Sequence, residues 1–208
     1  MMKSAVIVTV YKRYNYVMQA IQSVLRQSVL PDQVIIVADN INEIRREVPL
    51  PSKISNLTVI ESNYPQYGRM ISSAVDNLDD IDVVFFLDDD DMFKSNKIEY
   101  IKKIFEKNDN VIMVHNHQEY IDDNGNIIEN SFTKTLNQNQ PHKELVINSS
   151  NILFIYKHYP GIFFNNSSIS IRKYVLDKYK SFISNIELSL DIALLFISLL
   201  EGNVLHVP

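Results

Sequence analysis

The chain has 208 residues, of which 46% are apolar and 22% charged, as in an ordinary soluble globular protein. Its formal net charge is −5 and it has no basic run, so we expect no nucleic-acid partner. It contains no cysteine, which excludes disulfides and thiolate metal sites and agrees with a reducing compartment.

Short apolar runs alternate with amphipathic segments through the first half of the chain. Buried strands are expected at 5–10, 34–38, 57–60 and 83–87, with helices at about 15–28, from 68 onward and at 96–107. This alternation predicts βαβ units and therefore an α/β fold, with a mainly parallel central sheet and helices on both faces. The segment 41–53 contains two prolines and is predicted to be a loop.

The second half has a less regular pattern. A strand is expected at 111–114, followed by a hairpin that turns at Asn124-Gly125. Residues 130–150 are polar and rich in Asn and Gln, which predicts a mobile loop. The remaining elements are a strand at 169–171, a helix from 172 to about 180, a largely buried apolar helix at 188–200 and a last strand at 204–207.

The apolar stretches are too short to cross a membrane. ILFIY and IALLFISLL fall well below the roughly 18 residues that a membrane helix needs. The first residues, MMKSAVIVTVYKR, become charged too early for a signal peptide. We therefore expect a cytoplasmic protein without a transmembrane segment, and peripheral association with the inner face of the membrane stays open.

The stretch VVFFLDDDD, residues 83–91, places four aspartates directly after a predicted buried strand. Ligands of open α/β sheets bind at the carboxyl ends of the strands, and Asp39 ends another strand at the same edge. Adjacent carboxylates repel one another unless a cation compensates them, and a hard divalent ion suits oxygen ligands. The simpler alternative is an acidic helix start, although one or two acids would suffice for that.

Other metal and phosphate motifs fit this stretch poorly. A calcium loop starting at Asp88 would place Phe93 where an invariant glycine is needed. The four glycines are scattered, so no glycine-rich phosphate cradle exists, and a phosphate would have to be held through a metal ion and side chains. His115 and His117 alternate along a predicted strand, which fits a metal pair less well than ordinary surface or hydrogen-bonded histidines.

Taken together, five segments resemble family 2 glycosyltransferases of the GT-A fold. They follow the family's order from residue 5 to the C-terminus: AVIVTVYKR, AIQSVLRQSVLPDQVIIVADN, GRMISSAVDNLDDIDVVFFLDDDDMF, SISIRKYVL and SLDIALLFISLLEGNVLHVP. The resemblance implies a single GT-A domain over 1–208. Residues 1–110 would form a Rossmann-like half that binds the nucleotide sugar, and residues 111–208 would form the acceptor half.

The resemblance also implies roles for individual residues on the nucleotide side. Tyr11 would line the pocket for the nucleotide base, Asp39 would accept a hydrogen bond from that base, and Arg69 would approach the nucleotide. Asp39 could equally be a simple turn residue after its strand. The proline that usually follows the first strand in this family is absent here, where the sequence reads TVYKR.

Asp88 and Asp90 match the family's Asp-x-Asp motif. Asp88 would face the ribose or a metal-bound water, Asp90 would ligate the metal directly, and Asp89 between them is assigned to the nucleotide site. Asp191 matches the acid that opens the family's last core helix and acts as the catalytic base. It could also be an ordinary acid at a helix start, and the family's usual acidic pair is here Leu190-Asp191.

The implied activity is metal-dependent, inverting transfer of a sugar from a nucleoside-diphosphate sugar, such as a UDP sugar, to an acceptor hydroxyl. Mn²⁺ or Mg²⁺ would be the cofactor, and the acceptor would be a glycan, a lipid-linked molecule or a small molecule, as in polysaccharide biosynthesis. The alternative is a catalytically inactive relative that binds nucleotide sugars. The sequence does not indicate an oligomeric state.

Overall fold

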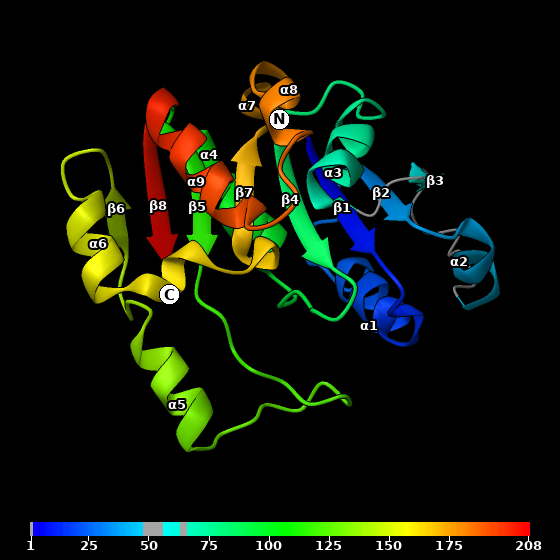
Figure 1. Cartoon of the computed structure of the whole chain (residues 1–208), viewed down its shortest axis with the longest axis horizontal. Coiled ribbons are helices and arrows are strands. Elements are labelled where there is room, and N and C mark those ends of the chain that lie inside the picture. The colour runs from blue at the N-terminus through cyan, green and yellow to red at the C-terminus, as the bar shows by residue number, and fades with distance from the viewer. Residues whose placement is uncertain (1, 48–55, 63–65) are drawn as a thin grey trace.

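The computed structural model describes residues 2–47, 56–62 and 66–208. Within these residues eight strands form one sheet, in the order β3-β2-β1-β4-β7-β5-β8-β6 (Figure 1). The strands are β1 (Ser4–Val10), β2 (Gln33–Ala38), β3 (Leu57–Glu61), β4 (Val83–Asp88), β5 (Val111–Asn116), β6 (Leu145–Ile147), β7 (Ile169–Arg172) and β8 (Asn203–Val207).

Helices connect these strands and cover both faces of the sheet. The α-helices are α1 (Tyr14–Leu25), α2 (Ile41–Glu47), α3 (Tyr67–Val75), α4 (Lys97–Lys107), α5 (Ser131–Gln138), α6 (Ile152–His158), α7 (Lys173–Lys178), α8 (Lys180–Ile183) and α9 (Leu190–Glu201). Two 3₁₀ helices, η1 (Pro160–Phe163) and η2 (Asn166–Ser168), precede β7. The predicted helix at 172–180 is thus two shorter helices, α7 and α8.

The first four strands form the parallel part of the sheet. β1 lies between β2 and β4 and is parallel to both, and β3 is parallel to β2. In this register Thr9 lies beside Asp88 and Val10 lies beside Ala38. The acids that follow β2 and β4 therefore meet at one edge of the sheet, as the sequence predicted.

The second half adds antiparallel pairs to the same sheet. β7 runs antiparallel between β4 and β5, β8 is parallel to β5, and β6 is antiparallel to β8. The predicted α/β class with a mainly parallel sheet is confirmed, and β6 and β7 are its antiparallel strands.

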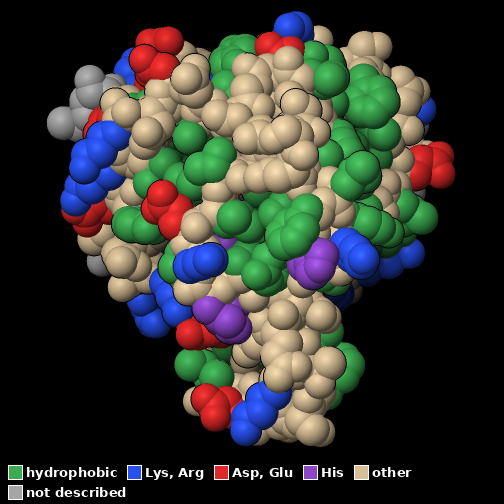
Figure 2. Space-filling model, turned by 90° about the vertical axis from the view of Figure 1, so that its left-hand side faces the viewer, with side chains coloured by type: hydrophobic (Ala, Val, Ile, Leu, Met, Phe, Trp, Pro, Cys, Tyr) green, Lys and Arg blue, Asp and Glu red, His purple; other side chains and the backbone are tan. Residues whose placement is uncertain are grey.

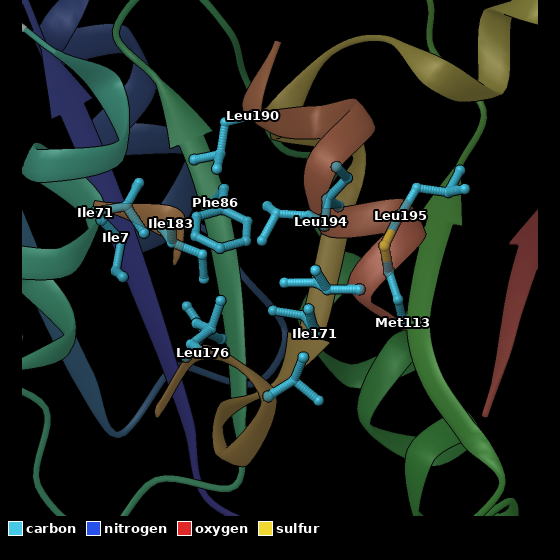
Figure 3. Packing of buried hydrophobic residues seen from close by; sticks show 14 of the residues in the cluster. Ile7, Ile71, Phe86, Met113, Ile171, Leu176, Ile183, Leu190, Leu194 and Leu195 are labelled. Carbon is cyan, nitrogen blue, oxygen red and sulfur yellow. The ribbon is translucent and has the colours of Figure 1, made fainter. Parts of the chain in front are cut away.

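Two apolar layers hold the helices against the sheet. Consecutive residues of β4 show why: Phe85 packs in the layer with α1 and α4, and Phe86 packs in the layer with α3 and α9. Figure 3 shows Phe86 facing Leu194 of α9 in the second layer. Both phenylalanines are fully buried, because successive side chains of a strand point to opposite faces.

A close backbone contact positions α3 at the carboxyl edge of the sheet. The amide of Gly68 donates to the carbonyl of Ile186 at 3.1 Å. A Cβ atom at Gly68 would come within 2.0 Å of the Ile183 carbonyl oxygen, so a larger residue would push the helix away. Tyr67, the residue before Gly68 on α3, is thereby held near Asp88.

The prediction of a mobile loop at 130–150 is wrong. Residues Ser131–Gln138 form α5 and Leu145–Ile147 form β6. The helix starts with a capping box, in which the Asn130 side chain accepts from the Thr133 amide at 2.9 Å and the Thr133 hydroxyl accepts from the Asn130 amide at 3.0 Å. The Asn-rich composition therefore supplies a helix cap.

Two other predicted irregular segments also differ from the structure. Residues 41–47 form α2 where a loop was predicted, because the Asn40 side chain caps the amides of Asn42 and Glu43. The rest of that predicted loop, 48–53, lies outside the described residues. The turn at Asn124-Gly125 is present, with Gly125 at φ 80°, but its arms share only one isolated bridge, Ile121 with Ile127.

The last helix is only partly buried. Leu190, Leu194 and Leu195 pack into the core, while Phe196 and Leu200 are 49% and 72% exposed, because the sheet covers only one side of α9. Hydrophobic side chains also gather on the face of the molecule that carries α6 (Figure 2). Among the described residues, no helix combines the length and apolar character needed to cross a bilayer.

A buried histidine pair joins β5 and β8. His115 and His206 lie beside each other in register, and their Nδ1 atoms are 3.0 Å apart. Their outer Nε2 atoms lie 3.4 Å from the Phe164 carbonyl and 2.9 Å from the Pro141 carbonyl. Burial lowers the pKa of His115 to about 3 and that of His206 to about 4. We therefore assign this pair a structural role in the sheet.

This pair predicts a loss of stability in acid. Both pKa values lie below the ordinary value of 6.5, so the unfolded chain binds protons first and stability falls as the pH drops below about 6.5. Each histidine steepens that fall by about 1.4 kcal/mol per pH unit, until the pH nears its folded pKa. Urea denaturation between pH 7.5 and 4.5 should give a shallower slope for His115→Gln than for the unmodified chain. Parallel slopes would contradict the assignment.

Candidate functional site

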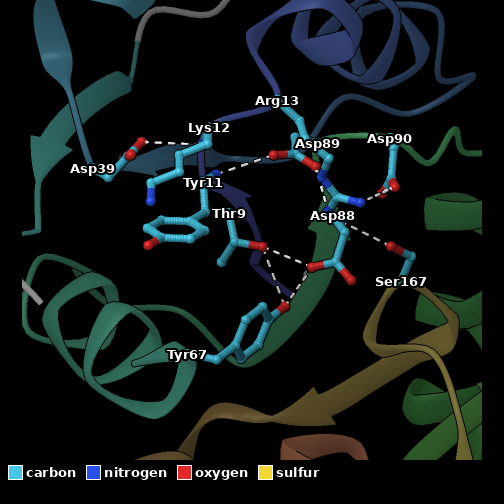
Figure 4. Close-up of polar contacts among 10 residues, drawn as sticks. All are labelled: Thr9, Tyr11, Lys12, Arg13, Asp39, Tyr67, Asp88, Asp89, Asp90 and Ser167. Atoms are coloured by element: carbon cyan, nitrogen blue, oxygen red, sulfur yellow. Dashed lines mark hydrogen bonds and ion pairs between the residues drawn. The ribbon is translucent and has the colours of Figure 1, made fainter. Parts of the chain in front are cut away.

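The loop between β1 and α1 contacts the acids that end β2 and β4 (Figure 4). Thr9 is the second-last residue of β1, and its hydroxyl donates to Asp88 Oδ1 at 2.7 Å. The Tyr67 hydroxyl donates to the same oxygen at 2.6 Å from the start of α3. Asp88 is thus held from two sides by neutral donors.

The next two aspartates are bound by the same loop. Asp89 Oδ2 accepts from the Tyr11 amide at 3.0 Å, and Asp89 Oδ1 pairs with Arg13 Nη2 at 2.7 Å. The other guanidinium nitrogen of Arg13, Nη1, pairs with Asp90 Oδ2. The Asp89 side chain is 1% exposed and that of Asp90 is 39% exposed, so only Asp90 extends into open solvent.

Asp39 lies at the far side of this loop. Its Oδ1 accepts from the Lys12 amide at 3.4 Å and from the Tyr14 hydroxyl at 2.6 Å. Burial and the Asp39 carboxylate raise the pKa of Tyr14 well above its usual range, so the tyrosine stays a proton donor. The Lys12 ammonium lies 4.8 Å from the centre of the half-exposed Tyr11 ring.

Asp191 reaches the same edge from the other side of the sheet. It lies in the first turn of α9, where its carboxylate accepts from the Asn165 amide at 3.0 Å and from the Ile192 amide at 2.9 Å. Asn165 in turn accepts from the Ser167 amide at 2.7 Å, and the Ser167 hydroxyl accepts from the Asp88 amide at 2.8 Å. The η2 segment therefore connects Asp191 to the Asp-x-Asp motif.

A buried lysine supports this connection. Lys97 opens α4, and its ammonium donates to the Ser167 carbonyl and lies 4.1 Å from the centre of the Phe93 ring. Burial lowers the pKa of Lys97 to about 7, and the nearby Asp91 carboxylate partly opposes that shift. Burial raises the pKa of Asp91, whose carboxylate interacts with Ser167 and Asn165.

The carboxyl groups of Asp88, Asp89 and Asp91 have raised pKa values. Burial raises the pKa of Asp88 to about 6 and that of Asp89 to about 6, although hydrogen bonds and Arg13 oppose these shifts. Burial also raises the pKa of Asp191, against its two amide contacts. Groups with such values can bind a cation or accept a proton close to neutral pH.

Strained backbone is concentrated at this edge. Within the described residues, the non-glycine residues with positive φ are Lys12 (61°), Asn165 (74°) and Ser189 (58°). The Lys12 amide donates a hydrogen bond to Asp39 and the Asn165 amide donates one to Asp191. Ser189 precedes Asp191 by two positions. Such conformations cost on the order of 1–3 kcal/mol each and persist where the surrounding structure holds them, often at functional sites.

The carboxylate oxygens at this edge suit only one kind of metal site. No group of three or more acidic or histidine side chains in the described part of the chain is arranged to hold a metal ion. Asp88 and Asp90 nevertheless offer carboxylate oxygens at the sheet edge, and ions such as Mg²⁺ are commonly bound by one or two carboxylates together with ligand phosphates. The residues therefore fit a divalent ion shared with a diphosphate and do not fit a closed protein cage.

The structure brings most of the predicted site residues together. Tyr11, Asp39 and the aspartate run meet at the β1–α1 loop, and Asp191 is joined to them through η2. Arg69 is exposed on α3, two positions after Tyr67. Asp89 faces the β1–α1 loop instead of solvent.

Sequence reasoning did not assign roles to several residues that shape the site. They are Thr9, Arg13, Tyr67, Lys97, Asn165 and Ser167. One signal was available, because YKRY places cations directly after a strand whose neighbour ends in aspartates. The contacts of Asn165 and Ser167 span 26 and 79 positions of sequence, and no local pattern indicates them.

A cavity of about 540 Å³ opens beside the aspartate run. Its lining combines residues of the site with residues of the second half: Asp91, Lys97, Asn165, Ser167, His117 and Glu119. Aromatic and aliphatic side chains, including Tyr100 and Ile121, complete the wall. Space for a ligand of moderate size therefore exists next to the acids.

Loss of the Tyr67 hydroxyl should raise the pKa of Asp88. The hydroxyl stabilises the ionised carboxylate, so Tyr67→Phe should move that pKa upward from about 6, by about one unit. ¹³C NMR titration of the aspartate carboxyl carbons measures it. Tyr179→Phe, which removes a hydroxyl bonded to Glu201, is the matched control and should leave Asp88 unchanged. An unshifted Asp88 in Tyr67→Phe would contradict the geometry.

Two sequence comparisons find proteins related to this chain. The sequence model of the family described as Glycosyl transferase family 2 matches residues 5–167. An uncharacterised glycosyltransferase of Nostoc sp. is 27% identical over an alignment of 183 residues, which covers 85% of this chain and 53% of the relative.

Solved structures share the fold. The TarS 1–349 structure from S. aureus in complex with UDP superposes with a TM-score of 0.66 at 14% identity, covering 99% of this chain and 58% of that one. A mannosyltransferase from Pyrobaculum calidifontis in complex with GDP-Man and Mn²⁺ gives a TM-score of 0.65 at 12% identity, covering 99% and 54%. The chain spans just over half the length of these relatives. It belongs to glycosyltransferase family 2 and has the GT-A fold.

Proposed function

We propose that this chain transfers a sugar from a nucleoside-diphosphate sugar to an acceptor hydroxyl, with inversion at the anomeric carbon. The observation that carries the proposal is the hydrogen-bonded path from Asp88 through Ser167 and Asn165 to Asp191. This path supports the proposal, because it joins an Asp-x-Asp motif to a carboxylate with a raised pKa within a family 2 fold. These are the two components that single-displacement sugar transfer needs.

The nucleotide is proposed to bind over the β1–α1 loop, in the half formed by residues 1–110. Tyr11 and Asp39 would contact the base, and Arg69 would approach the nucleotide from α3. A uridine nucleotide is the first candidate, because TarS structures contain UDP and UDP-GlcNAc, while a GDP-Man complex in another relative makes guanosine the second.

Asp90, with Asp88, is proposed to hold a divalent ion, Mn²⁺ or Mg²⁺, together with the diphosphate. The exposure of Asp90 supports the assignment, because its carboxylate is accessible while that of Asp89 is not. When bound, such an ion neutralises the charge that develops on the leaving diphosphate. The protein contributes an oriented Asp88, held by Thr9 and Tyr67.

Asp191 is proposed to act as the base. Its carboxylate takes the proton of the acceptor hydroxyl as that oxygen forms a bond to the anomeric carbon. The bond from the anomeric carbon to the diphosphate oxygen breaks in the same step, and its electron pair leaves with the nucleoside diphosphate. Burial raises the pKa of Asp191 and so improves it as a proton acceptor near neutral pH.

The acceptor is proposed to approach through the cavity beside Asp91, which the half formed by residues 111–208 helps to line. Its mixed lining suits a sugar ring or the aglycone of a small glycoside, since both aromatic side chains and polar groups line the cavity. A glycan or a lipid-linked acceptor presented at a membrane surface, as in polysaccharide biosynthesis, is compatible with this opening.

Nucleoside diphosphate should bind through a divalent ion held by Asp90. Calorimetry with UDP should show strong binding with Mn²⁺ and weak binding with a chelator. Asp90→Asn should lose more than the roughly 10–100-fold in metal affinity that removal of an outer-shell partner costs. Asp80→Asn removes an exposed acid that pairs with Lys3 and serves as the control. Equal UDP affinity with and without the ion would end the metal assignment.

Asp191→Asn should keep the fold and the donor affinity and lower turnover by about 10²–10⁴, the contribution of a positioned base. Glu187→Gln, which changes the exposed acid four positions earlier, should leave turnover near its normal level. Melting, donor titration and turnover on the same samples separate the roles. Full activity in Asp191→Asn would remove it from the mechanism, and donor binding without transfer or hydrolysis in the unmodified chain would indicate a binding-only relative.

A further inference from the structure

Arg13 makes two ion pairs in very different surroundings. One guanidinium nitrogen contacts Asp89, which is 1% exposed, and another contacts Asp90, which is 39% exposed. The Arg13 side chain itself is 53% exposed. The arginine thus spans from a buried carboxylate to a carboxylate at the surface of the site.

These two contacts differ in how easily they break. Removing the partner of a buried charge is strongly unfavourable, whereas an exposed ion pair contributes little. Asp89 is also tied to the Tyr11 amide at 3.0 Å, which fixes it beneath the loop. Arg13 therefore has a firmly held end on Asp89 and a releasable end on Asp90.

The releasable end lies where the proposed function needs both a metal ligand and a hydrogen-bond donor to the phosphate oxygens. A guanidinium carries five N–H donors in a fork that fits phosphate oxygens, and the two ion pairs use only two of its nitrogens. The neighbouring cations have other contacts, because the Lys12 ammonium lies over the Tyr11 ring and the Lys97 ammonium donates to the Ser167 carbonyl.

We propose that Arg13 is a releasable counter-ion of the Asp-x-Asp motif and becomes a ligand of the donor's diphosphate. Without nucleotide it neutralises Asp90. With a divalent ion on Asp90, it gives up that carboxylate, keeps Asp89 and turns its free N–H groups to the phosphate oxygens. This role rests on the proposed function, since it assumes that a nucleoside diphosphate binds at this edge.

The exchange makes the divalent ion and the nucleotide favour each other. Arg13 competes with the ion for Asp90 but attracts the diphosphate, so each ligand binds better when the other is present. The site would then take up a divalent ion mainly together with a nucleotide. The shared ion already couples the two ligands, and an arginine that only braced the loop would add nothing to that coupling.

Two binding measurements test the exchange without any assay of transfer. Mn²⁺ alone is titrated into the protein by calorimetry, and UDP is titrated in saturating Mn²⁺. Arg13→Met should bind Mn²⁺ alone about three- to tenfold more tightly, because Asp90 loses its competitor. The same variant should bind UDP about tenfold or more weakly, because a charge-assisted phosphate contact is lost.

Matched variants separate this role from general charge effects. Lys94→Met removes the same charge three positions after Asp91, where Lys94 pairs with Glu119, and should change neither affinity by more than about twofold. Arg13→Gln keeps a donor for Asp89 and replaces Arg13→Met if that variant fails to fold. It should give the same two opposite shifts.

The outcome is decided by the signs of the two shifts. Tighter Mn²⁺ with weaker UDP supports the proposal, and any other combination overturns it, including parallel weakening, which would mean that Arg13 only maintains the shape of the loop. If the unmodified protein binds neither Mn²⁺ nor UDP, the proposed function itself fails. If it binds both and Arg13→Met changes nothing, only the exchange is refuted.

Discussion

The arrangement depends on how negative charge is accommodated where β4 leaves the sheet. Four consecutive aspartates cannot all be ionised and desolvated side by side without compensation. The β1–α1 loop supplies it, with the Thr9 hydroxyl on Asp88, the Tyr11 amide on Asp89 and the Arg13 guanidinium on Asp89 and Asp90. Because β1 lies between β2 and β4, one loop can reach the acids of both neighbours. The same contacts leave Asp90 accessible, which is what a carboxylate that exchanges partners requires.

A second constraint joins the two halves of the molecule. Residues 165–167, at the start of η2, contact both acids: the Ser167 hydroxyl accepts from the Asp88 amide, and the Asn165 amide donates to Asp191. The Lys97 ammonium of α4 donates to the Ser167 carbonyl. Asn165 keeps a positive φ of 74° to make its contact. A strained residue that bonds the proposed base is best understood as part of the site, since strain persists only where neighbouring contacts hold it. The proposed donor side and the proposed acceptor side are therefore joined by one short segment.

Local patterns predicted some elements well and others poorly, for identifiable reasons. The strands at 5–10, 34–38 and 83–87 were predicted because they are buried on both faces and read as continuous apolar runs. Residues 130–150 were predicted as a loop because polarity outweighed the Asn130 capping signal. β6 is three residues long and exists through its pairing with β8, which no local pattern shows. The apolar character of α9 predicted a largely buried helix, but apolar content alone does not show how many sides of a helix are covered.

The sequence by itself determined the class of the fold, the family resemblance and the edge of the sheet where chemistry is expected, because apolar periodicity and an uninterrupted acidic run are local properties. Only the tertiary structure decided that the second half adds two antiparallel strands, β6 and β7, to the sheet. It alone also decided that Asp89 is buried against the β1–α1 loop, that Arg13 bridges two aspartates and that Asn165 orients Asp191. The physical reason is that these contacts join residues 26 to 78 positions apart, and their energies depend on burial and direction, which are settled only when the chain has folded.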